Sequence, residues 1–104
     1  MDPEDSKIVT LARATRARNA SAQGAAVRDE TGRTYSATNV ELAALRLSAL
    51  QVAVAMAVSS GAESLEAAAL VSDGDGPSAD DEAVVRELGA ETLLVAGPDG
   101  ELRS

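Results

Sequence analysis

The sequence predicts an α/β sandwich with a mixed sheet and the element order α-β-β-α-β-α-β. Two short apolar runs without alternation, at 64–72 and 91–96, are typical of strands covered on both faces. A segment with helical spacing precedes each of them, and a strand-turn-strand pattern comes earlier, so helices and strands alternate around one sheet. The 104 residues suit one domain, residues 1–104.

The N-terminal third is expected to hold one helix and one hairpin. Apolar side chains recur at helical spacing in residues 7–18, and arginines near the end of that segment suit the helix dipole. Residues 1–6 are expected to form a flexible lead-in. Two strand-like segments, 24–28 and 33–38, flank the turn at 29–32, and this pattern predicts a β-hairpin.

The segment 41–60 predicts a long buried helix, because its side chains leave almost no polar face. In so small a domain, a sheet can cover only one side of such a helix. The other side needs a neighbouring helix or another subunit, and we expect the 42–58 helix to contribute to the interface of a homodimer or homotetramer. Gly61 is expected to end the helix. The apolar residues of the segment are Leu42, Ala43, Ala44, Leu45, Leu47, Ala49, Leu50, Val52, Ala53, Val54, Ala55, Met56, Ala57 and Val58.

The C-terminal half is expected to alternate between strand and helix. After the strand at 64–72, the residues Asp-Gly-Asp-Gly-Pro at 73–77 predict a loop. A short helix is expected at 78–88, ending at Gly89. The second buried strand, 91–96, is followed by a turn at 97–100.

Composition narrows the classes of function. The net charge is −8, with an isoelectric point near 4.3, so nucleic acid and anionic membrane surfaces are poor partners. The chain has no Cys and no His, which removes thiol chemistry, the commonest general base and the commonest zinc ligand. The acidic N-terminus differs from a signal peptide, and the longest apolar run is too interrupted for a membrane span. We expect a cytoplasmic protein.

Several local strings, in this order and at this spacing, resemble the cytidine deaminase family. The resemblance runs from about Leu11 to the end of the chain. It implies the family's fold, with a mixed sheet and a central helix. The strings that carry it are Gly24-Ala25-Ala26-Val27 with Asp29 and Gly32, Thr38-Asn39-Val40-Glu41, the segment 53–61, the segment from Pro77 to Gly89, and Pro98-Asp99-Gly100.

The same alignment shows where the chain departs from the family. The family opens its central helix with C-A-E or H-A-E, and Ser48-Ala49-Leu50 stands there. Ser78 and Asp81 stand where the P-C-x-x-C segment supplies two thiolates. Zinc deaminases need a His or Cys, two further Cys and a glutamate that moves protons. Ser48, Leu50, Ser78 and Asp81 therefore mark a degenerate zinc site, and we expect no metal, no cofactor and no deaminase activity.

Two interpretations compete for the acidic segment after residue 72. The favoured one is that Ser78 caps a helix, with acidic residues in its first turn. The other is that Asp73, Asp75, Asp80 and Asp81 gather around a hard cation. Their spacing matches no EF-hand, so capping is the preferred interpretation.

Asn39 and Glu41 also allow two interpretations. In the resembling enzymes this asparagine and glutamate hydrogen-bond the ribose, so they are the candidate ribose-binding residues here. The phenylalanine expected in that pocket falls near Ser21, which leaves a base with nothing to stack on. The preferred interpretation is that Asn39 and Glu41 cap and charge the start of the central helix.

These observations lead to competing functional hypotheses. The first is a catalytically inactive cytidine deaminase-like protein that acts as an assembly or regulatory interaction module. The second is a protein that binds a nucleoside or other small molecule at the former ribose site. The third is an enzyme, either an active hydrolase of the family or one in which Glu41, Asp80 and Asp81 converge with perturbed pKa values.

Overall fold

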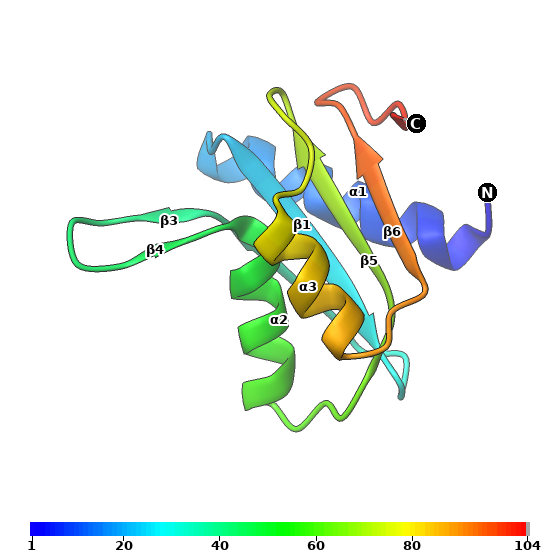
Figure 1. Ribbon diagram of the computed structural model, residues 1–104. Coiled ribbons are helices and arrows are strands. Elements are labelled where there is room, and N and C mark those ends of the chain that lie inside the picture. Colours follow the sequence, from blue (N-terminus) through cyan, green and yellow to red (C-terminus); the bar gives the residue numbers. More distant parts are fainter. Residues whose placement is uncertain (104) are drawn as a thin grey trace.

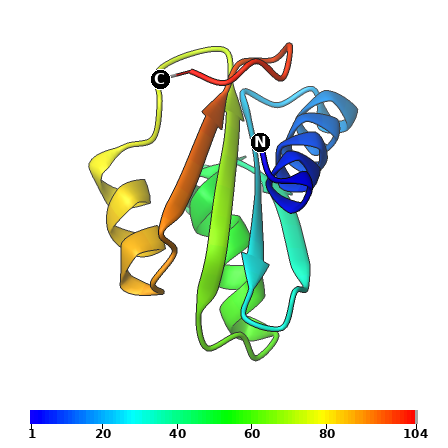
Figure 2. The same cartoon turned by 90° about the vertical axis from the view of Figure 1, so that its right-hand side faces the viewer.

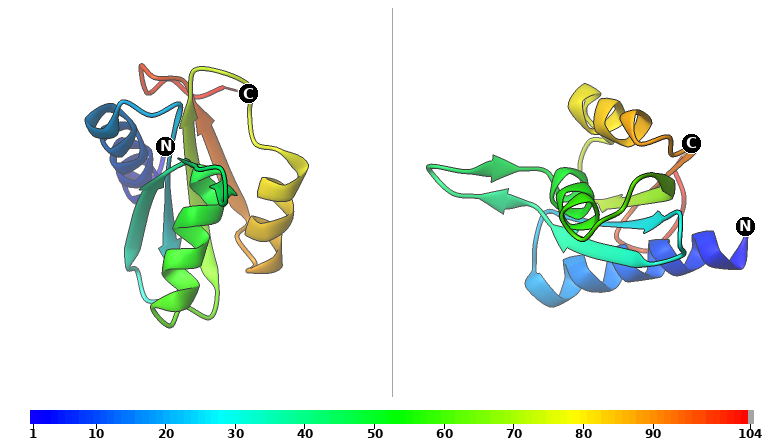
Figure 3. Two further views of the ribbon diagram at one scale, coloured as in Figure 1. Left: turned by 90° about the vertical axis from the view of Figure 1, so that its left-hand side faces the viewer. Right: turned by 90° about the horizontal axis from the view of Figure 1, so that it is seen from below.

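A computed structural model describes residues 1–103 of the chain, and the last residue of the expected domain, Ser104, lies outside the described residues. One four-stranded mixed sheet forms the central layer, with a helix on one face and two helices on the other (Figures 1 and 3). The helices are α1 (Pro3–Asn19), α2 (Ala49–Ser59) and α3 (Ala79–Glu87), and the sheet strands are β1 (Gln23–Asp29), β2 (Thr34–Thr38), β5 (Leu65–Ser72) and β6 (Thr92–Ala96).

The sheet has the strand order β2-β1-β5-β6, which confirms the expected mixed sheet. β1 pairs antiparallel with both β2 and β5, and β5 pairs parallel with β6 through the crossover that contains α3. Figure 2 shows this sheet with α1 lying along one side of it. The bounds of β1, β2, β5, α3 and β6 agree with the sequence expectation to within one or two residues.

Each face of the sheet has its own apolar core, built almost entirely from Ala, Val and Leu. The core under α1 consists of Ile8, Val9, Ala12, Ala26, Ala67, Ala69, Val71 and Ala96. The core under α2 and α3 consists of Ala25, Val27, Ala37, Ala49, Leu50, Ala53, Val54, Ala57, Leu65, Ala68, Leu70 and Val85. Small side chains let these layers approach closely, so each core is thin but tightly packed.

Gly24 marks the closest approach of α1 to the sheet. A Cβ atom added at Gly24 would lie 2.1 Å from the carbonyl oxygen of Ala12 and 2.7 Å from Cβ of Arg16. No side chain fits in that space, so the position requires glycine for packing and not for backbone conformation.

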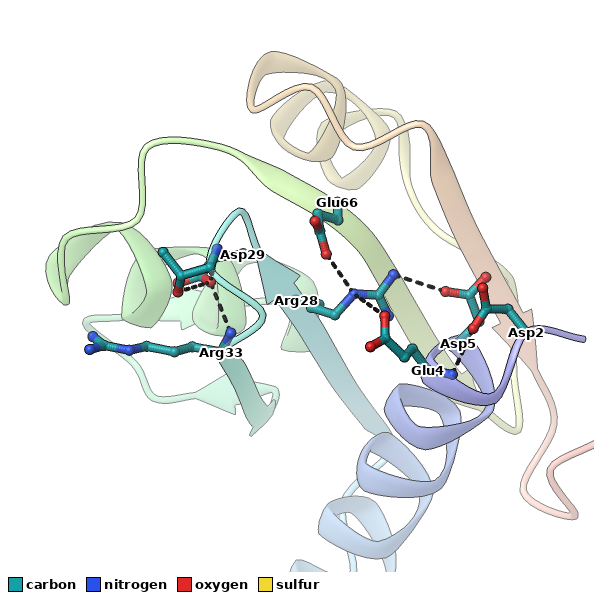
Figure 4. Close-up of polar contacts among 8 residues, drawn as sticks. Asp2, Glu4, Asp5, Arg28, Asp29, Arg33 and Glu66 are labelled. Atoms are coloured by element: carbon teal, nitrogen blue, oxygen red, sulfur yellow. Dashed lines mark hydrogen bonds and ion pairs between the residues drawn. The ribbon is translucent and has the colours of Figure 1, made fainter.

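Arg28 and Asp29, which are adjacent in the sequence, make polar contacts at one end of β1 (Figure 4). Arg28 donates to Glu66 at 2.9 Å and to Asp5 at 3.1 Å, so it ties α1 and β5 to β1. Burial acts to lower the pKa of Arg28, but the hydrogen bonds that it donates to these carboxylates, together with their negative charge, outweigh burial and hold the pKa above the ordinary value. Asp29, only 2% exposed, points to the opposite face and organises the β1–β2 turn.

The prediction that residues 1–6 form a flexible lead-in is wrong for most of that segment, because α1 begins at Pro3 and not at residue 7. Asp2 caps the helix by accepting a hydrogen bond from the Glu4 N–H at 2.8 Å. Proline suits the first helical position because the N–H it lacks would have no partner there. Acidic residues in the first turn also favour the helix dipole.

The prediction of one long helix at 41–60 is wrong for the first third of that segment. Residues 40–47 instead form a short hairpin of β3 (Val40–Glu41) and β4 (Arg46–Leu47), which projects away from the sheet (Figures 1 and 3). α2 starts only at Ala49, because Ser48 caps it in a reciprocal capping box with Gln51.

The outer side of this segment is exposed in the single chain, so its burial against a second copy stays a prediction. α2 buries one face against the sheet, while Met56 is 41% and Val58 is 48% exposed on its outer side. Leu42 and Leu45 on the hairpin are 59% and 47% exposed. The described chain thus carries apolar side chains on its surface along the segment that was expected to pack against a second copy.

None of the helices within residues 1–103 combines the length and the apolar character that crossing a membrane would require.

Candidate functional site

A cleft of about 870 Å³ lies beside the projecting hairpin. The hairpin, the start of α2 and the loop that follows β5 form its walls. Both candidate ribose-binding residues, Asn39 and Glu41, and one of the degenerate zinc positions, Ser48, lie in the lining. The lining residues are Ala22, Gln23, Asn39, Val40, Glu41, Leu42, Ala43, Arg46, Leu47, Ser48, Ser72, Asp73, Gly74, Asp75 and Gly76.

Asn39 and Glu41 line the cleft but do not cap a helix, so the preferred interpretation of this pair is wrong. Asn39 Oδ1 accepts a hydrogen bond from the Gln23 N–H at 3.0 Å, which holds the Asn39 side-chain amide next to the start of β1. Glu41 lies opposite Arg46 in the register of the β3–β4 hairpin, and its side chain is exposed. The central helix begins after Ser48, several residues beyond either side chain.

Gln23 links the same part of the sheet to α2. Its backbone N–H donates to Asn39, and its side-chain Oε1 accepts from the Ala49 N–H at 3.2 Å. Sequence reasoning missed Gln23 and Arg46 as lining residues. No motif singles out either residue, and their roles follow from how the hairpin folds over the end of β1.

The degenerate zinc positions Ser48, Ser78 and Asp81 are brought together, although Ser48 and Asp81 are 33 residues apart in the chain. The Ser48 hydroxyl donates a short hydrogen bond to Asp81 Oδ1. Asp81 Oδ2 accepts from the Ser78 N–H at 3.1 Å, and the Asp81 N–H donates to Ser78 Oγ at 3.0 Å. Asp81 is only 2% exposed, so its carboxylate is buried between the N-termini of α2 and α3.

Leu50, the fourth degenerate position, is fully buried in the core under α2. Its apolar side chain can neither accept nor donate a proton. The capping role expected for Ser78 is confirmed, because Ser78 and Asp81 form a reciprocal capping box at the start of α3.

The residues that the sequence matches to the family's metal positions do not fit zinc. Two are neutral hydroxyls, and the single carboxylate already accepts hydrogen bonds from both of its neighbours. Zinc sites in proteins rely on thiolate, imidazole and carboxylate ligands, and those donors would all have to come from Asp81 here. We derive no chemical step through a metal at this position.

The hard-cation hypothesis is also not supported by the arrangement of the acidic residues. Asp73 forms an ion pair with Arg16 at 3.1 Å, and Asp81 faces inward toward Ser48. Within residues 1–103, no three His, Cys, Asp or Glu residues are grouped so that they could hold a metal ion. The convergence of Glu41, Asp80 and Asp81 that the enzyme hypothesis requires does not occur either, because of these three only Glu41 lines the cleft.

No aromatic side chain lines the cleft. The segment near Ser21, where the family's phenylalanine was expected to align, contributes Ala22 to the lining. The single aromatic residue, Tyr35, lies on β2 and its hydroxyl donates to Asp29 at 3.3 Å. A planar ligand in this cleft would therefore have no aromatic ring on which to stack.

Comparisons with known proteins agree with this arrangement. A sequence profile described as cytidine deaminase-like matches residues 1–100. No curated protein sequence matches the chain significantly. Among solved structures, the cytidine deaminase of Burkholderia pseudomallei aligns with a TM-score of 0.77 and 27% identity, over 93% of this chain and 87% of that one.

Two mycobacterial structures are similar in the same way. The cytidine deaminase of Mycobacterium tuberculosis aligns with a TM-score of 0.74 and 26% identity, over 98% of this chain and 90% of that one. The enzyme of Mycobacterium leprae aligns with a TM-score of 0.74 and 24% identity, over 98% and 93%. The sequence profile covers nearly the whole chain and the structural matches agree with it, so the chain belongs to the cytidine deaminase-like family.

Proposed function

We propose that this protein is a catalytically inactive member of its family that acts as an assembly or regulatory interaction module. The observation that carries the proposal is the composition of the Ser48–Asp81 junction. Deamination by zinc enzymes needs a metal-activated water and a glutamate that shuttles protons. The residues that the sequence matches to the metal positions are two hydroxyls and one hydrogen-bonded carboxylate, and a fully buried leucine is matched to the glutamate position.

The interaction role is supported by the surface of the 42–58 segment. Leu42 and Leu45 on the hairpin, and Met56 and Val58 on the outer side of α2, are each more than 40% exposed. Exposed apolar side chains gathered along one segment favour association, because burial removes them from water. The partner that we propose is a second copy of this chain.

Charge favours self-association through this segment over the rest of the surface. Each copy carries a net charge of −8, so most surfaces of two copies repel one another. The outer side of α2 carries no charged side chain, and the hairpin carries one residue of each sign, Glu41 and Arg46. In a two-fold arrangement, Glu41 of one copy could face Arg46 of the other.

Mass measurement by light scattering tests the assembly proposal. We expect a dimer or tetramer at micromolar concentration, and Leu45→Lys combined with Met56→Lys should shift it toward the monomer. Lysine reduces the net negative charge, so the loss of association could not be attributed to greater repulsion between copies. Leu102→Lys is the control, because Leu102 is similarly exposed, at 46%, outside the segment. A monodisperse wild-type monomer would contradict the proposal.

Enzyme assays test the proposed inactivity separately. With added zinc, we expect no conversion of cytidine to uridine above the rate without protein. Any turnover that depends on the folded protein would show that the chain is an active hydrolase and that the proposal is wrong.

Nucleoside binding is a second candidate function, favoured by one specific observation. Asn39 and Glu41, the residues that match the family's ribose-binding pair, line the same cleft. A nucleoside at 100-fold excess over its Kd would stabilise the protein by about 2.7 kcal/mol. We would measure thermal unfolding with cytidine and uridine, with Glu41→Gln as the matched variant. If neither nucleoside raises Tm, nucleoside binding is contradicted and the assembly role remains.

A further inference from the structure

We propose that Ser48 and Asp81 form a metal-independent clamp that joins the N-termini of α2 and α3. The inference uses the family membership and does not depend on whether the protein assembles or is inactive. It assigns a present-day role to positions that have lost the family's zinc chemistry.

The geometry of the clamp links two elements that are distant in sequence. Ser48 caps α2 and donates to Asp81 Oδ1, while Asp81 lies in the first turn of α3 and closes the capping box with Ser78. The same carboxylate therefore accepts from a side chain at one helix terminus and from the Ser78 N–H at the other. Both oxygens of this buried carboxylate have partners, as burial of a charge requires.

The electrostatics explain why a carboxylate suits this place. Helix N-termini carry partial positive charge, and two of them meet here. A divalent zinc held by three thiolates has a net charge of −1, and an ionised carboxylate has the same net charge. Asp81 can thus replace the metal cluster without changing the charge that the two helices face.

The clamp matters for α3 because this helix has few other anchors. Among the helices and strands, α2 is the main neighbour of α3. Val85 is its buried apolar contact, and the Leu88 carbonyl accepts from the Leu65 N–H at 2.9 Å near its C-terminal end. The N-terminal end depends on the hydrogen bonds of Asp81.

Thermal unfolding of a double-mutant cycle tests the proposal, at one protein concentration and with Ser48→Ala, Asp81→Asn and the double variant. Loss of an ordinary helix cap lowers Tm by about 4–8 °C in a domain of this size. Ser78→Ala should show that cap effect alone. We expect Ser48→Ala to lower Tm by roughly twice as much, because it also leaves a buried carboxylate oxygen unpaired.

The double variant should lose clearly less than the sum of the two single losses, because the two side chains act as one unit. Asp80→Asn, which changes the same charge in the same helical turn on an exposed residue, should lower Tm by less than about 4 °C. A strong chelator should leave the wild-type Tm unchanged. Additive single losses, or a fall in the wild-type Tm with chelator, would overturn the clamp.

If Asp81→Asn does not fold, Ser48→Thr decides the matter. Threonine keeps the hydroxyl, and Ser48 lines the cleft and is only partly buried. Ser48→Thr should retain most of the wild-type Tm while Ser48→Ala does not. Equal losses would show that the hydroxyl does not hold Asp81, and the proposal would fail. None of these readings depends on oligomeric mass or enzymatic turnover, so the clamp and the proposed function can fail separately.

Discussion

The two faces of the sheet are built differently, although both cores use the same small apolar residues. On the α1 face the helix backbone touches the sheet at Gly24, and Arg28 ties the helix to two strands. On the α2–α3 face the helices meet at a polar junction, a hairpin projects beyond them, and apolar side chains stay exposed. The α1 face is closed and structural, so candidate functions concentrate on the α2–α3 face.

The sharpest test of this contrast is to restore a metal to the α2–α3 face. The triple variant Ser48→Cys, Ser78→Cys and Asp81→Cys should bind zinc, because two helix N-termini lower the pKa of the thiols that they face. Without zinc, the variant loses the clamp and the cap at Ser78, so it should be less stable than wild type. With zinc at 1,000 times its Kd, stability should rise by about 4 kcal/mol.

Zinc titration followed by thermal unfolding checks this prediction. The control carries three cysteines at exposed positions on separate elements, with Thr10, Ser59 and Glu101 as suitable sites. If the clamp variant binds zinc no more tightly than this control, the matching of Ser48, Ser78 and Asp81 to the family's metal positions is wrong. Adding Leu50→Glu should still give little or no deamination, because no aromatic wall lines the cleft.

Sequence reasoning reached the fold because the fold depends on local patterns. The buried strands, the β1–β2 turn and the cap at Ser78 each have a signature within a few residues. The hairpin at 40–47 has none. Its turn is closed by the Leu42 N–H donating to the Leu45 carbonyl at 2.8 Å, across two alanines that favour helix and carry no turn signal.

The candidate site was predictable only in part, for the same reason. The family resemblance placed Ser48 and Ser78 at helix starts, and both are N-caps. The bond between Ser48 and Asp81 spans 33 residues, and nothing in either local sequence indicates it. The placement of Asn39 was expected to serve a helix start, but it depends on Gln23, which β1 brings to the same edge.

A second prediction tests the closed face directly. Gly24→Ala places a Cβ atom 2.1 Å from the Ala12 carbonyl oxygen, so α1 must shift away from the sheet. Forcing extra volume into a tightly packed contact costs about 1–3 kcal/mol, and a backbone obstacle puts this variant at the upper end. Urea or thermal unfolding measures the loss.

Gly76→Ala is the matched control for that variant. A Cβ atom at Gly76 would have no other atom within 4 Å, and the residue lies in the loop beside the cleft. We expect its stability to match wild type to within about 0.5 kcal/mol. Equal effects of the two alanines would contradict the tight contact that distinguishes the α1 face.

The smallest expected effect is a change of Tm with acid, and it distinguishes the two buried aspartates, Asp29 and Asp81. Burial acts to raise the pKa of Asp29, but hydrogen bonds from Thr31, Arg33 and Tyr35 outweigh it and hold the pKa below the ordinary value. Ionised Asp29 therefore adds stability above the unfolded-state pKa of about 3.9, and this contribution is lost as pH falls through the lower folded-state value.

Asp29→Asn should lower Tm at pH 7 but bring the variant closer to wild type below about pH 4. Asp75→Asn, in the exposed loop after β5, is the control, and it should lower Tm at pH 7 by clearly less than Asp29→Asn does. A constant difference in Tm between Asp29→Asn and wild type across this range would show that the charge of Asp29 does not support the turn. All hydrogen-bond partners of the Asp29 carboxylate lie within six residues, so the acid response should be confined to the β1–β2 hairpin, whereas loss of Asp81 disturbs two helices.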